Sequence, residues 1–174
     1  KEDLVMNAGY VTEWTQTQVL NNLATLYVSG KAFEGTFDGG GHTISGVFAQ
    51  NTNTSGAVGA GLFLQTGAGA VIRNLKLVES KFEGYRHTGS ILGQHAGAGG
   101  VLLENVVVSN VSVKTTDAEA GGVIGSANGK VTVNNVTVDA DVSCTGTGGA
   151  GGIVGRLMVS AASNRKLSVE NVII

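Results

Sequence analysis

The first residues that could carry out acid–base chemistry are Asp38 and His42, which lie four positions apart in a glycine-rich segment. A carboxylate beside an imidazole could act as a general base. The same residues also fit a turn that leads into a strand, because Asp and Gly favour turns. The turn is the stronger interpretation, so no catalytic role is predicted for this pair.

The densest charged group in the sequence consists of Glu79, Glu83, Arg86 and His87. Polysaccharide lyases and hydrolases built on stacked strands need several carboxylates, or a calcium-binding acid set beside an Arg or Lys, on one face. The nearest further acid in an equivalent place is Asp141. One acid per repeat is few for catalysis, so we interpret this group as a solvated edge and predict that the chain is not an enzyme.

Two acidic pairs, Asp117 with Glu119 and Asp139 with Asp141, have the alternate spacing that places both side chains on one face of a strand. In a loop such pairs could bind calcium weakly, but the EF-hand pattern does not occur. The lone cysteine, Cys144, is expected to be a small buried side chain. We predict no metal site and no cofactor.

Residues 146–151 (GTGGAG) fit the spacing of a dinucleotide-binding fingerprint, with Glu170 about 20 residues further on. However, Gly151 also begins a glycine motif that occurs four other times without the fingerprint. The repeat explains more of the sequence, so we interpret this segment as a loop between strands.

The composition indicates many strands joined by tight bends. Glycine supplies 28 of the 174 residues and proline none, and proline would remove a hydrogen-bond donor from a strand ladder. The formal net charge of −2 and the lack of a basic cluster argue against nucleic-acid binding. No apolar run approaches the roughly 18 residues of a membrane span.

Two motifs repeat in step along the chain. Copies of a glycine motif begin at Gly35, Gly61, Gly89, Gly121 and Gly151. A second motif follows each copy and has apolar residues two before, one after and three after a central Asn. A straight strand has a period of two, so this slip in phase indicates a corner, and Asn tolerates the left-handed conformation that a corner needs.

We therefore predict a corner ladder, in which the central residues of successive repeats stack and their amides hydrogen-bond to one another. In the first copy, Gly takes the place of Asn. The predicted members are Gly46, Asn74, Asn105, Asn135 and Asn171.

These repeats predict an all-β fold, a right-handed parallel β-helix of about five rungs, where a rung is one circuit of the chain. A leucine-rich repeat has a similar period, but its Asn follows the apolar strand residues instead of preceding an apolar pair. The expected interior columns are Phe37, Phe63, Ile91, Val123 and Ile153 on one wall, and Ile44, Ile72, Leu103, Val133 and Val169 on another.

The two ends of the chain differ from the repeats. Apolar residues at helical spacing between residues 15 and 28, with Thr17 as N-cap, predict a short helix that covers the first rung. We therefore divide the chain into a capping segment, residues 1–30, and a β-helix, residues 31–174. Because the sequence stops within a repeat, we expect the chain to be part of a longer protein.

Each later glycine motif contains two adjacent apolar residues, and side chains alternate across a strand. If the first of each pair points inward, the second points outward. The outward residues, Leu64, Leu92, Ile124 and Val154, are then predicted to form an apolar stripe that either meets a partner or is covered by the protein's own loops.

Residues 33–47 (FEGTFDGGGHTISGV) resemble the opening signature of bacterial GLUG-motif proteins, and residues 121–125 (GGVIG) and 151–155 (GGIVG) are similar to their repeats. The resemblance covers nearly all the chain after Trp14, although Gln65 stands where a repeat would end in Gly. It implies a secreted or surface-attached bacterial protein, adhesin-like or beside a surface peptidase domain, with no inherited catalytic set.

We therefore predict a non-catalytic extracellular or cell-surface module for adhesion, spacing or partner presentation. One alternative is a carbohydrate-binding or carbohydrate-active β-helix, for which Tyr85 and Trp14 are the main exposed aromatic candidates. Another is an accessory domain of a surface peptidase. The expected partners are other domains of the same protein, a host protein or a glycan, and neither nucleic acid nor membrane insertion is expected.

Overall fold

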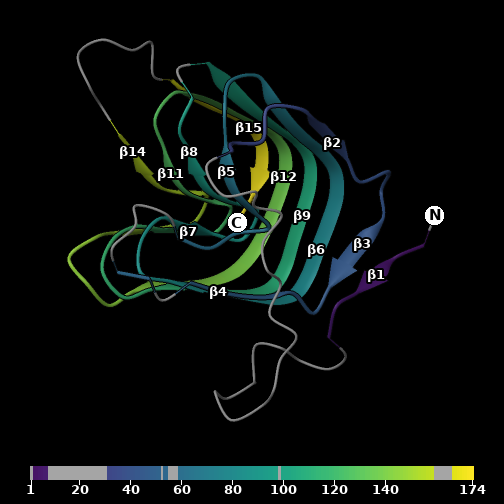
Figure 1. Cartoon of the computed structure of the whole chain (residues 1–174). Coiled ribbons are helices and arrows are strands. Elements are labelled where there is room, and N and C mark those ends of the chain that lie inside the picture. The colour runs from purple at the N-terminus through teal and green to yellow at the C-terminus, as the bar shows by residue number, and fades with distance from the viewer. Residues whose placement is uncertain (1, 8–30, 52, 55–58, 98, 159–165) are drawn as a thin grey trace.

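The computed structural model describes residues 2–7, 31–51, 53–54, 59–97, 99–158 and 166–174. These residues form an all-β parallel solenoid of about 4 turns, with fifteen strands and no helix among them (Figure 1). The expected parallel β-helix architecture is therefore confirmed. Within the described segments, no helix is long and apolar enough to cross a membrane.

Three long strands form the curved wall of the solenoid: β6 (Ala70–Gly84), β9 (Gly100–Thr115) and β12 (Lys130–Cys144). They lie side by side in parallel register, and β15 (Leu167–Ile173) continues the sheet (Figure 1). Ile72 pairs with Leu103, which pairs with Val133, so equivalent residues stack in columns. β6 and β9 each turn at two left-handed corners without being divided into separate strands, whereas β12 has one such corner and a register shift between Val138 and Ala140.

The first corner lies at the Asn of the second motif. Asn74, Asn105, Asn135 and Asn171 have φ angles of 54°, 53°, 53° and 52°, in the left-handed region. In β6, Ile72, Leu75 and Leu77 are buried, at two before, one after and three after the Asn. The corner therefore keeps apolar side chains inside on both of its arms, as the slip in phase indicates.

A second corner follows five residues after the first, and the sequence analysis missed it. Glu79 and Asn110 have φ angles of 48° and 52°, and Gly46 has a φ of 67°. Gly46 is level with Glu79, because its N–H donates to Val78 O and Ser45 pairs with Val78. The placement of Gly46 in the Asn corner was therefore wrong. Gly46 belongs to the second corner.

The error has a physical cause in β2 (Thr36–Asp38) and β3 (Thr43–Ser45), which pair with the two arms of β6. Phe37 stacks on Ile72 and Ile44 on Leu77, so the predicted columns for Phe37 and Ile44 were also wrong. Between the two strands the chain makes a wider bend at Gly40 and Gly41, both at positive φ. This bend lengthens the first corner and hides its equivalence with Asn74.

The later glycine motifs join two smaller sheets. One contains β7 (Thr88–Gly89), β10 (Ala120–Gly121) and β13 (Ala150–Gly151). The other contains β5 (Phe63–Thr66), β8 (Leu92–His95), β11 (Ile124–Ala127) and β14 (Val154–Leu157). A Cβ at Gly121 would lie 2.6 Å from Gly155 N, and one at Gly89 would lie 2.6 Å from Gly125 N. The motif therefore needs glycine because backbones meet there at close range.

The predicted apolar stripe does not lie on the surface. Leu92 and Ile124 are fully buried, Leu64 is almost so and Val154 is half-buried. Phe63, not Leu64, pairs with Leu92, and its ring lies 5.3 Å from that of Phe37 in the core. Because the chain bends between β7 and β8, Ile91 and Leu92 do not alternate across one straight strand, and both are buried.

At the N-terminal end, β1 (Leu4–Val5) pairs with β3 and extends the large sheet, and β4 (Phe48–Asn51) pairs with β6. The predicted capping helix between residues 15 and 28 lies outside the described residues. The division at residue 30 stays a prediction, although residues 4 and 5 join the same sheet as the repeats.

Candidate functional site

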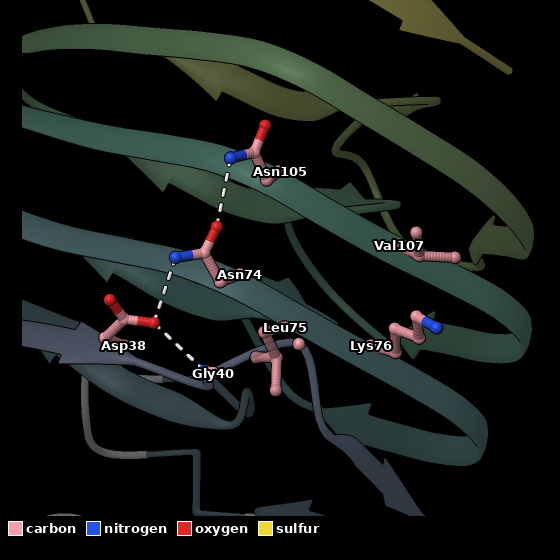
Figure 2. Close-up of a pocket in the computed structure, with 8 residues that line it drawn as sticks. Asp38, Gly40, Asn74, Leu75, Lys76, Asn105 and Val107 are labelled. Carbon is pink, nitrogen blue, oxygen red and sulfur yellow. Dashed lines mark hydrogen bonds between the residues drawn. The ribbon is translucent and has the colours of Figure 1, made fainter.

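The outer surface of the first corner carries a row of side-chain amides, which we call the amide row: Asn74, Asn105 and Asn135. The Asn105 amide donates to Asn74 Oδ1 at 3.0 Å (Figure 2). The Asn135 amide donates to Asn105 Oδ1 at 2.7 Å. Asn171 departs from the row, because its amide donates to Asn134 Oδ1 at 3.4 Å. Each amide thus bonds the rung below it.

Asp38 ends the amide row at its acceptor side. Its carboxylate accepts hydrogen bonds from the Asn74 amide at 3.0 Å and from Gly40 N at 2.9 Å (Figure 2). It also accepts one from Arg73 Nε at 2.9 Å. The bonds from Asn74 and Gly40, followed by that from Arg73, lower the pKa of Asp38 to about 2. The aligned amide dipoles therefore end on a carboxylate that stays ionised.

An open groove of about 510 Å³ runs beside the amide row. Leu75 and Val107 supply its apolar part, and Lys76 supplies a cation at its edge (Figure 2). The groove can offer hydrogen bonds from the amides of Asn74 and Asn105. The arrangement suits contact with a polar ligand, whereas its one carboxylate, that of Asp38, is already held by three hydrogen bonds.

The structure does not pair Asp38 with His42. His42 Nδ1 lies 3.4 Å from Asp3 Oδ1, while Asp38 is bound to Arg73 and Asn74. A turn at Gly40 and Gly41 separates them. The two residues that sequence spacing suggested as a general-base pair therefore take part in separate structural contacts.

The charged group around Glu83 is divided among several contacts. Glu83 pairs with Lys81 at 3.1 Å and accepts a bond from the Gln50 amide at 2.9 Å. Arg86 Nε donates to Asp117 Oδ2 at 2.7 Å, and its guanidinium lies 5.2 Å from the ring centre of Tyr85. The acid next to this group is therefore Asp117, one rung on, and not the expected Asp141.

A polar cluster crosses three successive rungs at His87 and Glu119, which are buried, and Arg156, whose side chain is exposed. Glu119 Oε1 accepts a 2.6 Å bond from Arg156, and Glu119 Oε2 lies 2.8 Å from His87 Nδ1 without the alignment of a hydrogen bond. Glu119 is only 5 % exposed. Burial opposes its ionisation, but Arg156 and His87 outweigh this and lower the Glu119 pKa. For His87, by contrast, burial lowers the pKa, because it disfavours the charged imidazolium.

The repeat spacing signals the neighbouring Arg86–Asp117 pair but not this cluster. Asn74 and Asn105 are 31 residues apart, and so are Arg86 and Asp117. Applying the spacing of the corner motif to the intervening loops would have brought Arg86 to Asp117. It would not have placed Glu119 beside His87, because the second loop is one residue longer.

The acidic pairs do not form a metal centre in the part of the chain that the structure describes, where no group of three or more His, Cys, Asp or Glu residues could hold an ion. Asp117 and Glu119 bind cationic side chains, and Asp139 accepts a bond from Asn110 N at 3.3 Å. Cys144 is half-buried, and its thiol donates to Ala118 O at 2.9 Å.

The glycine-rich segment at residues 146–151 stacks on the loop of the rung below. Gly148 N donates to Asp117 O at 3.0 Å, and a Cβ at Gly148 would lie 2.7 Å from Ala118 Cα. The segment leads into the short strand β13. Its glycines therefore serve the packing of loop on loop, as the repeat interpretation expects.

Comparison with known proteins finds little similarity. No family model matches the chain, and no solved structure matches it. Halomucin from Haloquadratum walsbyi (strain DSM 16790 / HBSQ001) is 33% identical over 125 residues, which is 71% of this chain and 1% of halomucin. The chain thus spans about one hundredth of the length of this relative, and it is similar to a short stretch of a far longer protein.

Proposed function

We propose that this chain is a non-catalytic module of an extracellular or cell-surface protein, which spaces neighbouring parts and presents a binding surface. The observation that carries this proposal is the bonding of polar side chains from rung to rung. The amide row, the Arg73–Asp38 pair and the Arg86–Asp117 pair all connect successive circuits of the chain.

A stack of this kind has the mechanical properties that a spacer needs. Backbone hydrogen bonds hold the rungs about 4.8 Å apart, and the buried columns fill the interior with Val, Leu and Ile. The outer polar contacts add a second set of links on the surface. Adding rungs lengthens such a rod in equal steps without changing its contacts.

Two similarities support the proposed location. The relative, halomucin, is a surface-associated protein. The glycine motifs resemble those of GLUG-type surface proteins, and the close backbone approach at Gly121 and Gly125 gives the motif a structural reason. We therefore assign the chain to GLUG-type surface repeats as part of the same proposal.

The location can be tested by labelling intact source cells with an antibody raised against residues 31–174. The proposal predicts labelling without permeabilisation, at a level close to that of permeabilised cells. An antibody against a cytoplasmic protein serves as the control for cell integrity. Labelling that requires permeabilisation would contradict an extracellular module.

A further inference from the structure

A small pocket opens at the end of the third arm of the long strands, away from the amide row. Gln50, Glu83 and Lys114 form a column across three rungs. Tyr85 and Thr116 follow the ends of β6 and β9 directly. These five side chains line a cavity of about 200 Å³.

We propose that this pocket binds one acidic sugar unit of an extracellular polysaccharide, with the Tyr85 ring as the contact surface and the Lys114 ammonium as the partner of the sugar's anionic group. The site goes beyond the proposed spacer function. A solenoid can space and display domains whether or not it holds a ligand here.

Tyr85 is held in place before any ligand arrives. The guanidinium of Arg86 lies 5.2 Å from the Tyr85 ring centre, and Arg86 is itself fixed by its 2.7 Å bond to Asp117. A ring that is already ordered loses little conformational entropy on binding. Its electron-rich face attracts the weakly positive C–H groups of a sugar ring.

The charges around the pocket favour an anion. Glu83 is engaged by Lys81 at 3.1 Å and by the Gln50 amide at 2.9 Å. Lys114 stands on the next rung, opposite Glu83, yet it forms no ion pair among the described residues. The Arg86 charge is balanced by Asp117. The pocket therefore holds one uncompensated ammonium beside an aromatic ring.

The remaining lining and the volume suit a single sugar ring. Thr116 brings a hydroxyl, which can donate to or accept from ring hydroxyls, while the Gln50 amide is already bonded to Glu83. A cavity of about 200 Å³ is smaller than the roughly 300–1,000 Å³ of pockets that enclose drug-sized ligands. A longer chain would therefore place one unit in the pocket and leave its neighbours on the surface.

The test is a calorimetric titration of the purified chain with an oligogalacturonate, a neutral malto-oligosaccharide of equal length, and sodium acetate, all at one ionic strength. We expect saturable binding of the oligogalacturonate, binding of the neutral sugar weaker by about tenfold, and no saturable binding of acetate. Equal binding of the neutral sugar would overturn the acidic preference, and equal binding of acetate would reduce the site to a simple anion contact.

Two variants connect the binding to the pocket. Lys114→Gln and Tyr85→Ala should each weaken oligogalacturonate binding by about tenfold, whereas Lys130→Gln, which removes an exposed lysine outside the pocket, should leave it unchanged. Thermal melts of all three variants must match the parent. Binding that survives both pocket substitutions, or no binding by the parent, would refute the site and leave the surface location to its own test.

Discussion

The replacement Asn105→Leu tests the amide row most sharply, because two effects act on one residue. Asn105 adopts a φ of 53°, where a side chain such as Leu meets its own backbone at a cost of about 1 kcal/mol. The change also removes two amide bonds, to Asn74 and from Asn135. These bonds are exposed, so each contributes about 0.5 kcal/mol.

The expected loss in the free energy of unfolding is therefore about 2 kcal/mol, which for a domain of this size lowers the melting temperature by about 4–8 °C. Urea denaturation followed by circular dichroism gives the free energy directly. Asn134→Leu is a control: Asn134 itself has no positive φ, and its side chain makes two long bonds of 3.4 Å, one donated to Glu104 and one accepted from the Asn171 amide.

We expect Asn134→Leu to change the stability by less than about 0.5 kcal/mol. The reasoning would be refuted if Asn105→Leu unfolded at the same urea concentration as the parent. It would also be refuted if both Leu variants lost the same stability, because the left-handed corner would then contribute nothing specific.

Three further predictions follow from the same structure. The pKa of Asp38 in the folded protein is about 2, below the ordinary value of 3.8. Its contribution to stability is therefore present above pH 3.8 and declines as the pH falls toward 2. The difference in melting temperature between the parent and Asp38→Asn should shrink over that range of pH. Gly125→Ala should lower the free energy of unfolding, measured by urea denaturation, by about 3 kcal/mol or more, because its Cβ would lie 2.5 Å from Thr88 N. Gly149→Ala is the control and should be nearly neutral, because a Cβ there would have no atom within 4 Å. Incubation with pectins, glycosaminoglycans and host glycans should yield no new reducing ends or unsaturated products, and turnover that Glu83→Gln abolished would count against a non-catalytic module.

The sequence predicted the parts of the fold that depend on one residue type in a fixed local setting. The slip in phase at Asn74 and Asn105 is visible because apolar residues must stay inside on both arms of a corner. The close backbone approach at Gly121 and Gly125 excludes any side chain, so the glycines repeat with the rungs.

The wrong predictions concern places where a bend changes the number of residues between equivalent positions while the residue types stay ordinary. Gly40 and Gly41 lengthen the first corner, so Gly46 was matched to the wrong one. The bend before Leu92 breaks the alternation on which the predicted surface stripe depended. In both places the pattern of apolar residues is ordinary, and only the backbone path distinguishes the alternatives.

The contacts around Glu119 were not predicted because Glu119 and His87 lie in loops, and only Arg156 lies in a strand, β14. His87, Glu119 and Arg156 come from three rungs whose loops differ in length, so a constant repeat does not bring them into line. Their attraction is strengthened by the burial of His87 and Glu119, which has no signature in the local sequence.

The account rests on the claim that the rungs are equivalent units that bond to one another through the same columns. Val101 and Val131 occupy equivalent positions on neighbouring rungs. Deleting residues 101–130 therefore removes one whole rung and lets Asn135 take the place of Asn105 above Asn74. The account predicts that the shortened chain keeps a β-rich circular dichroism spectrum and melts in one cooperative transition, at a lower temperature than the parent. A shortened chain that was unfolded, or that melted without a cooperative transition, would contradict the claim.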